Sequence, residues 1–461
     1  MEVFRLAHAG IVVSADGFRC LMDPILAEPF EAGANVFEPP AIIDPAFAAR
    51  CDALILSHAH GDHFSVASLV HLPRGMPVFY PAGDDLIATA LARLGFAGAT
   101  PVTPGESRRV GPLTCTFTRS EVPFPEMGVL FEHDGQSLWN CVDSILGDAA
   151  FATVARRTKR LDAMLVAYQT LVEEPLWRDA LGSGFPYDEY RNSLAAVRRA
   201  APRCAMPSAC GYRYADAALN ARGFPVTEDE FLADLAVFAP EVSGVRLPPG
   251  TALDCGALTV CEVVPGALAR AQAADQADRR EWAPERGIEA LRDHNPHGYP
   301  AAALRGIVGA WLDTACDAAA SAAAADWRAR LAAARAVWRL EIVYPDGGSE
   351  IRWMDFAAPH PRWISAAPRP PQIRTAIPAS TIAGLLDGAS NAYQALFTRR
   401  VAITLRTLEE GGMTAWGGLG DEPIARLLFP GADRRHLERE LARFGYGRPS
   451  QALSRSRALG R

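Results

Sequence analysis

Several features that would place a protein outside the cell or in a membrane are missing from this sequence. None of its nine cysteines forms a Cys-x-x-Cys pair, and their number is odd, which argues against a disulfide framework and predicts reduced thiols in a cytoplasmic protein. The opening MEVFRLAHAGIVVSADGF has no basic segment followed by a long apolar stretch, so it indicates a first strand and not a signal peptide. No window of 18 apolar residues occurs, so we expect no membrane span.

Lysine is almost absent, and the overall charge is weakly acidic. The formal net charge of −7 and the pI of about 5.9 give no electrostatic reason to expect nucleic acid or an anionic membrane as a partner. Apolar residues make up 49% and charged residues 21% of the 461 residues. We therefore expect a soluble globular protein of two or three domains. The partner that we predict is a small-molecule substrate.

Strand-like and helix-like segments alternate over the first half of the chain. The run CDALILS (51–57) predicts a buried strand, and DDLIATALARLG (84–95) has apolar residues at helical spacing with a glycine stop. Residues 1–25 are typical of two strands around a turn at 15–17. This alternation predicts an α/β domain with covered sheets over residues 1–265.

The pattern changes near residue 265. ALARAQAADQADRREW (267–282) and the alanine-rich stretch 315–336 predict long helices, so residues 266–336 are expected to form a helical connector. WRLEIVYPDGGSEIRWMDF (338–356) predicts a hairpin with a Pro-Asp-Gly-Gly turn. Residues 337–461 are therefore expected to form a separate C-terminal α+β unit.

The stretch 54-LILSHAHGDHFS-65 places four strong metal ligands in one turn after an apolar strand. Imidazole and carboxylate groups are natural ligands for divalent transition metals. Residues two apart in an extended chain point the same way, so His58 and His60 can bind one ion. Asp62 and His63 then turn toward a neighbouring position. The spacing favours two metal ions over one, and the alternative is a surface loop that is merely rich in histidine.

The HxHxDH pattern of residues 58–63 resembles the signature of the metallo-β-lactamase superfamily, whose fold is an αββα sandwich. The resemblance implies that His58 and His60 bind one metal ion. It also implies that Asp62 and His63 bind the other, and that an aspartate from the end of a later strand bridges the two.

The resemblance extends to flanking residues. LAHAGIVVSADGFRCLMDPIL (6–26) is similar to the opening hairpin of the lactonase-like branch, which places His8 and Asp23 near the site. Asp23 would then hold a ligand histidine. The alternative for Asp23 is an Asp-Pro turn, and the alternative for His8 is a structural histidine. The bridging residue is best interpreted as Asp143, at the end of SLWNCVD, with Asp148 as its nearest competitor.

One expected histidine is replaced by a carboxylate. The superfamily pattern needs a third histidine near residues 118–127, where TRSEVPFPEMG offers Glu121 and Glu126 instead. Glu121, at the end of the predicted strand, would take the place of the histidine, unless it is a solvated strand-end carboxylate. With a glutamate at this position, the sequence resembles a diiron branch of the superfamily, which includes a β-hydroxylase of antibiotic biosynthesis. Mixed histidine and carboxylate sites suit iron and manganese, whereas histidine-rich sites suit zinc.

The final histidine of the superfamily pattern is also missing. The corresponding segment, 204-CAMPSACGYRY-214, contains none. Cys210 could supply a thiolate, although an inert buried cysteine is the alternative, and a glutamate at 173 or 174 could also reach the site. An open coordination position or a single metal ion would fit equally. The side chains that we place near this side of the pocket are Gln169, Cys210 and Tyr212.

The last third of the chain resembles a sterol-carrier-protein-like unit. A metallo-β-lactamase domain joined to such a tail is similar to the CMP-N-acetylneuraminate hydroxylase group, whose members also carry a Rieske domain. This sequence has no Cys-x-His pair and hence no Rieske centre, so electrons would have to come from a separate protein. The alternative role for the tail is a structural cap or a contact in a homodimer.

Two enzymatic functions fit these residues. The first is a non-haem diiron oxygenase that hydroxylates or N-oxygenates a small metabolite, in which Glu121 joins His58 and His60 on one iron. The second is a zinc or manganese hydrolase, similar to lactonases or phosphodiesterases, in which catalytic Asp62 or Asp143 orients a metal-activated water. A binding module that has lost its chemistry is a third possibility, which the intact HxHxDH pattern disfavours.

Overall fold

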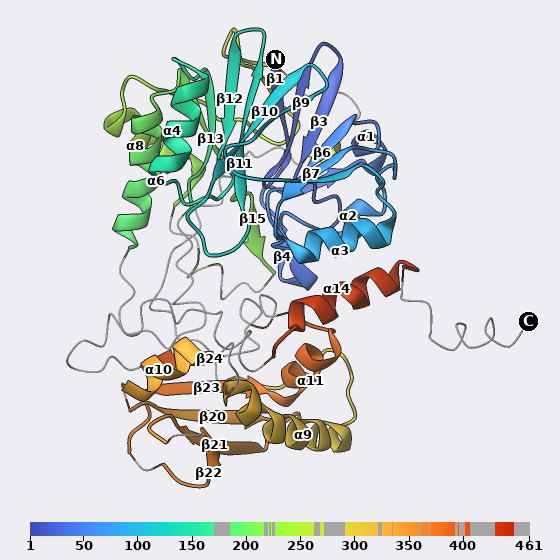
Figure 1. Cartoon of the computed structure of the whole chain (residues 1–461), viewed down its shortest axis with the longest axis vertical. Coiled ribbons are helices and arrows are strands. Elements are labelled where there is room, and N and C mark those ends of the chain that lie inside the picture. Colours follow the sequence, from blue (N-terminus) through green and yellow to red (C-terminus); the bar gives the residue numbers. More distant parts are fainter. Residues whose placement is uncertain are drawn as a thin grey trace, which may run out of the picture.

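The computed structural model describes most of the chain, as two units shown in Figure 1. The described residues are 1–169, 185–215, 220, 223, 226–261, 268–271, 291–320, 325–333, 335–358, 361–367, 369–391, 395, 402–405 and 429–446.

Two large sheets make up the first unit. The eight-stranded sheet has the order β18 (Thr259–Cys261), β17 (Ala252–Asp254), β1 (Glu2–Ala7), β2 (Gly10–Ala15), β3 (Phe18–Met22), β6 (Ala53–Ile55), β7 (Val78–Pro81) and β8 (Ala99–Val102). The seven-stranded sheet has the order β16 (Ser243–Gly244), β14 (Cys204–Ser208), β13 (Ala163–Ala167), β12 (Gln136–Asn140), β11 (Met127–His133), β10 (Leu113–Arg119) and β9 (Ser107–Val110). Two short pairs, β15 (Tyr212–Tyr214) with β4 (Asn35–Phe37) and β19 (Leu268–Ala271) with β5 (Ala41–Ile43), lie beside them.

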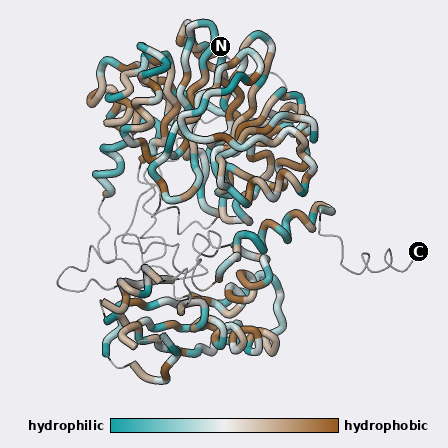
Figure 2. Tube along the Cα trace, viewed as in Figure 1, coloured by the Kyte–Doolittle hydropathy of each residue, from teal (hydrophilic) through white to brown (hydrophobic). Residues whose placement is uncertain are grey.

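The two sheets face each other, and helices cover their outer faces. Completely buried side chains such as Val13 and Phe117 fill the space between the sheets. The helices α1 (Pro45–Ala48), α2 (Val66–Leu69) and α3 (Asp85–Leu94) pack on the first sheet, and α4 (Asp148–Arg157), α6 (Tyr187–Ala200) and α8 (Glu228–Phe238) pack on the second. Hydrophobic stretches follow the strands of both sheets (Figure 2). This is a mixed α/β arrangement with the layer order expected of the metallo-β-lactamase fold.

The opening of the chain differs from the sequence prediction. Residues 1–25 form three strands and not two, because the backbone reverses at His8 and Ala9 between β1 and β2. His8 adopts a positive φ of 48°, a conformation that a non-glycine residue rarely adopts. The predicted turn at 15–17 is present as well, between β2 and β3. The extra turn places His8 at the end of β1, next to the metal-ligand motif.

The second unit contains a five-stranded sheet with helices. Its order is β22 (Trp363–Ile364), β21 (Ser349–Asp355), β20 (Val337–Val343), β23 (Ile373–Pro378) and β24 (Ala402–Leu405), accompanied by α9 (Ala301–Ala320), α10 (Ala325–Ala333), α11 (Ala379–Asp387) and α14 (Ala432–Arg443). The predicted hairpin is confirmed, because β20 and β21 pair antiparallel around residues 344–348. The sterol-carrier-like resemblance and the domain boundaries remain predictions.

The predicted helix at 267–282 is wrong at its start. Leu268–Ala271 is the strand β19, paired antiparallel with β5 of the first unit, and residues 272–290 lie outside the described residues. Alanine-rich sequence does form helices further along, in α9 and α10. The strand shows that tertiary pairing has overridden the helical preference of an alanine-rich segment.

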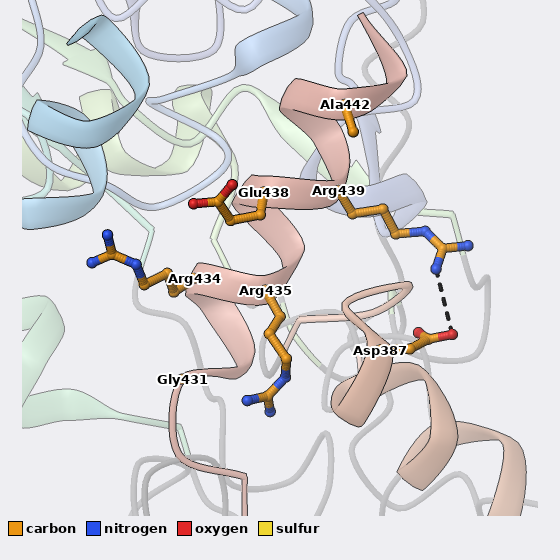
Figure 3. A pocket seen from close by; sticks show the side chains of 7 residues that line it. All are labelled: Asp387, Gly431, Arg434, Arg435, Glu438, Arg439 and Ala442. Carbon is orange, nitrogen blue, oxygen red and sulfur yellow. Dashed lines mark ion pairs between the residues drawn. The ribbon is translucent and has the colours of Figure 1, made fainter. Parts of the chain in front are cut away.

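Helix α14 connects the two units. Arg93 of α3 pairs with Glu438 at 2.8 Å, and Arg74 donates to the hydroxyl of Tyr446 at 3.0 Å. On its other side, α14 contacts α11, because Arg439 of α14 pairs with Asp387 of α11 at 3.4 Å (Figure 3). No described helix is long and apolar enough to cross a membrane.

Candidate metal centre

The HxHxDH turn lies where two neighbouring parallel strands end. β3 and β6 run parallel, and the backbone N–H of Asp23 donates to the carbonyl of Ile55 at 3.1 Å. Asp23 and Ser57 therefore leave the sheet side by side. The turn then closes on itself, with the N–H of His63 donating to the carbonyl of His60 at 2.9 Å, and α2 follows. Ligands and active sites commonly lie beyond the carboxyl ends of such strands.

Asp23 orients two histidines of this turn. Its Oδ1 accepts from the N–H of Ser57 at 2.8 Å, and its Oδ2 accepts from the Ser57 hydroxyl at 2.6 Å and from Nδ1 of His63 at 3.0 Å. Because the Ser57 hydroxyl donates to Asp23, its oxygen accepts from Nδ1 of His58 at 2.9 Å. Both Nδ1 atoms thus carry a proton, so the Nε2 atoms are the ones whose lone pairs a metal would use.

These two lone pairs converge on carboxylates. Nε2 of His58 lies 3.8 Å and Nε2 of His63 lies 3.5 Å from Oδ2 of Asp143, and Nε2 of His63 lies 3.7 Å from Oδ2 of Asp62. Two ligands about 2.1 Å from one ion are about 3–4 Å apart, so these separations suit shared metal coordination. Neither Nε2 atom, nor Oδ1 of Asp143, has a hydrogen-bond partner among the described residues. Buried groups of this kind need a partner, and the donor set fits a divalent metal.

His60 and Asp62 extend the centre in a second direction. Single donor atoms of His58, His60 and Asp62 all lie within 4.8 Å of one another, as do those of His58, His63 and Asp143. His58 and His63 are completely buried, whereas His60 is exposed and its ring lies 4.9 Å from that of Phe124. Overlapping groups of this kind suit two ions, with His60 on the solvent side.

The charges of the centre shift its pKa values in opposite directions. Burial lowers the pKa of His58, and the neighbouring His63 and His60 lower it further. Burial would also lower the pKa of His63, but the charges of Asp143 and Asp62 outweigh it and raise that pKa to about 10. Burial would raise the pKa of Asp62, yet His63 and His8 hold it well below its usual range. The metal-free centre therefore carries a proton on His63 that a metal ion must displace.

The structure places His8 in direct contact with the turn. Its Nε2 donates to Oδ2 of Asp62 at 3.2 Å, and it is almost completely buried. One donor atom each of His8, Asp62 and His63 lie within 4.8 Å of one another, so His8 can either orient Asp62 or bind metal itself. Tyr212 of β15, another predicted pocket residue, packs edge-on against the His8 ring at 5.0 Å between centroids.

Glu121 is not among the residues that the structure brings together. Its side chain is 40% exposed and lies 3.6 Å from Arg119, as the alternative interpretation of a strand-end carboxylate expected. Glu126 is buried instead, with Oε2 lying 3.9 Å from Nδ1 of His58. Burial and the charge of Asp143 raise the pKa of Glu126 to about 7. Of the two glutamates in this segment, the second lies beside the centre.

The remaining predicted residues have other contacts. Cys210 is buried, and burial raises the pKa of its thiol to about 12, which disfavours a thiolate ligand. Gln169 pairs with the backbone of Val226 through both its amide atoms and so ties the end of β13 to the start of α8. Asp148 is ion-paired with Arg199 at 2.7 Å, which removes the competitor of Asp143. The glutamates at 173 and 174 lie outside the described residues.

Two residues of the site were missed by sequence reasoning. Ser57 immediately precedes the motif, and its role as a relay between Asp23 and His58 depends on the parallel pairing of β3 and β6. Glu31 lies beside the turn, although 27 positions separate it from His58 in the sequence (58 minus 31). No local pattern could reveal either role, because both depend on tertiary packing.

Comparison with known proteins yields no match at the sequence level and several at the structural level. No family model and no curated protein matches the chain. The isothiocyanate hydrolase from Delia radicum gut bacteria is 16% identical, covers 55% of this chain and 98% of its own, and has a TM-score of 0.41. The diiron β-hydroxylase CmlA from Streptomyces venezuelae is 15% identical, covers 57% and 54%, and has a TM-score of 0.38.

A third similar structure is Igni18, a metallo hydrolase from Ignicoccus hospitalis. It is 16% identical, covers 57% of this chain and 99% of its own, and has a TM-score of 0.38. All three are thus similar to a little over half of this chain, and they comprise two hydrolases and a diiron hydroxylase. Identities and TM-scores this low do not assign a function to this chain.

Proposed function

We propose that this chain is a metal-dependent enzyme with a centre for two divalent ions. The observation that carries the proposal is the convergence of two buried Nε2 atoms, each oriented through Asp23, on Asp143. His58 and His60 would hold one ion, and Asp62 and His63 the other, with Asp143 between them. His8, which shares a group of close donor atoms with Asp62 and His63, would complete the second group, where the final histidine of the superfamily pattern is missing.

The proposed reaction is oxygenation by a diiron centre. Two carboxylates, Asp62 and Asp143, share the centre with the histidines, and mixed histidine and carboxylate ligation suits iron better than zinc. Glu126 lies on the Nδ1 side of His58, where it would support this ligand and not replace Glu121 on the metal. The iron pair would supply the activation of dioxygen for hydroxylation or N-oxygenation of a small metabolite. Electrons would come from a separate donor protein.

The protein's own residues prepare the site for this chemistry. Asp23 and Ser57 keep the protons on the outer nitrogens of His58 and His63, so no tautomer change is needed when metal binds. Burial keeps water from one side of the centre, while the exposed His60 and the Phe124 ring beside it mark the open side. The substrate would therefore approach from the side of His60 and Phe124.

Metal-assisted hydrolysis is the second candidate, and one observation favours it. The side chain of Asp143 is one-third exposed, and its Oδ1 has no hydrogen-bond partner among the described residues. A carboxylate in that position can orient a metal-bound water toward a substrate bond. The exposed position of Glu121 also removes the residue on which the sequence argument for iron rested.

Metal identity separates the two reactions. The protein is purified without added metal for elemental analysis, then reconstituted with iron for Mössbauer spectra and for oxygen consumption with a reductant. Oxygenation predicts about two irons per chain, with the spectrum altered in Glu126→Gln and unchanged in the matched Glu121→Gln. Tightly bound zinc that is indifferent to Glu126, with turnover of lactones or phosphodiesters, would instead establish hydrolysis.

A further inference from the structure

Glu31 is a buried carboxylate that no part of the proposed chemistry uses. It opens the short 3-10 turn η1 (Glu31–Gly33), has a positive φ of 50° and is only 5% exposed. Its Oε1 accepts a hydrogen bond from the side-chain amide of Asn391 at 3.1 Å. Asn391 lies in the second unit, just after α11, so this contact links the two units inside the molecule.

The other oxygen of Glu31 lies against the metal-ligand turn. A Cβ atom built on Gly61 would lie only 1.8 Å from Oε2 of Glu31, so the carboxylate fills the space where any side chain at position 61 would stand. Gly61 lies between the proposed ligands His60 and Asp62. The backbone N–H of Gly61 also acts on this carboxylate and lowers a pKa that burial raises.

A second contact from the same unit reaches the other end of the turn. Helix α14 packs against α2, which begins at Val66 directly after the motif, and against α3. Leu69 of α2 and Leu441 of α14 belong to one continuous cluster of buried apolar side chains. Figure 1 shows α14 between the two sheets of the first unit and the sheet of the second. Residues of the C-terminal third therefore contact α2 directly, and Asn391 contacts the Glu31 carboxylate that packs against Gly61.

We propose that Glu31 and Asn391 form a positioning contact through which the C-terminal unit fixes the HAHGDH turn in its metal-binding conformation. The inference rests on the metal centre of the proposed function, but not on whether that centre oxygenates or hydrolyses. Asn391 holds the Glu31 carboxylate, and the carboxylate fixes the backbone at Gly61. The orientation of His60 and Asp62 then depends on a residue more than 300 positions away in the sequence (391 minus 62).

A contact that only joins the two units would give different experimental results from a contact that positions the turn. If Glu31 and Asn391 only joined the units, their loss would lower the stability of the interface and leave metal geometry unchanged. If they position the turn, their loss must change metal affinity and the ligand field. Residues that orient metal ligands commonly contribute about 10–100-fold to affinity.

The test is cobalt(II) titration of the full-length protein, followed by visible absorption and by competition with a chelator. Asn391→Ala and Glu31→Ala should each weaken cobalt binding at least tenfold and alter the absorption bands. The double variant should be no weaker than Glu31→Ala alone, because both changes remove one contact. Glu31→Gln keeps the shape and the acceptor for Asn391, so it should bind nearly as well as wild type.

The matched control is Glu438→Gln, which breaks the interface ion pair with Arg93 away from the turn. It should leave cobalt affinity and spectrum unchanged. Circular dichroism and melting temperature establish that each variant is folded. Unchanged cobalt binding in folded Asn391→Ala and Glu31→Ala, or an equal loss in Glu438→Gln, would overturn the inference while leaving the metal centre intact. Failure of the wild type to bind cobalt would overturn both proposals.

Discussion

At the scale of single residues, the centre depends most on Asp23, which accepts hydrogen bonds from Ser57 and His63. Asp23→Asn replaces one acceptor oxygen by an amide that cannot accept them. We expect metal affinity to fall by about 10–100-fold, measured by chelator competition. The control is Asp52→Asn, because Asp52 also accepts a backbone hydrogen bond, from Arg19, but is exposed. Equal affinities of both variants would contradict the role of Asp23.

A second residue-scale prediction concerns protons. Burial would lower the pKa of His63, but Asp143 and Asp62 raise it to about 10 in the metal-free protein. Since metal needs the unprotonated Nε2, binding at pH 7 should release about one proton, and apparent affinity should rise by up to about tenfold per pH unit. Calorimetric titration in buffers of different ionisation enthalpy measures the release. Binding without proton release would contradict the protonated state of His63.

The same shift predicts how pH affects the stability of the metal-free protein. The folded-state pKa of His63 lies above its ordinary value of 6.5, so its stabilisation is complete below that pH and is lost as pH rises through about 10. Burial also raises the pKa of Glu31 to about 8, so the stability that protonated Glu31 provides is likewise lost as the pH rises from about 4.5 to 8. The melting temperature should therefore fall from pH 6.5 to pH 9. A rise would contradict both shifts.

The sequence predicted the candidate metal ligands of the turn better than the residues that surround and orient them. HxHxDH is a local pattern, so residues 58–63 could be singled out without a structure, and the resemblance to the superfamily pointed to Asp143 at the end of a predicted strand. Glu121 and Glu126 could not be ranked in the same way. Which of the two glutamates points inward depends on the path of the loop that contains Pro123 and Pro125, and this path has no periodic signal.

At the scale of elements, the space between the two sheets should contribute most to stability. Phe117 of β10 is completely buried there, with side chains of both sheets around it. Phe117→Ala should lower the free energy of unfolding by about 3–5 kcal/mol, measured by urea denaturation. Phe238→Ala, at the end of α8, is the control, since that side chain is only partly buried. A loss below about 1 kcal/mol in Phe117→Ala would contradict a close-packed layer.

Elements with a strong local signal were predicted and those formed by distant pairing were not. Helix α3 ends at Gly95 in the left-handed conformation, as the glycine stop indicated. β19 lacked any such signal, because its pairing with β5 joins segments more than 200 residues apart (268 minus 43). The break between β1 and β2 was also missed, since a positive φ at a histidine is rare.

At the scale of the whole molecule, one continuous apolar cluster crosses the boundary between the two units. It includes Leu91 of α3 in the first unit and Leu437 of α14 in the second. We therefore expect the two units to unfold together in denaturant. Hydrogen exchange with mass spectrometry tests this, because peptides from β12 and β20 should lose protection at the same denaturant concentration. Earlier loss in β20 peptides would show two independent units.

The sequence indicated two units but not how closely they are joined. The change in composition near residue 265 was visible, whereas the buried contact between Glu31 and Asn391 was not. Contacts of this kind depend on how two units dock, and neither strand nor helix periodicity reports docking. The C-terminal unit thus had to be predicted as separate, whereas the structure shows Asn391 of this unit bonded to Glu31, which packs against Gly61 of the proposed metal-ligand turn.

The most direct test of the central claim is native mass spectrometry of the metal-loaded protein. The mass of the folded chain should show two bound divalent ions. Asp143→Asn, which removes the carboxylate between the two groups, should retain one ion or none, whereas Asp148→Asn, on the surface, should retain two. No tightly bound ion in the wild type, or two ions in Asp143→Asn with unchanged affinity, would contradict a dinuclear centre built around Asp143.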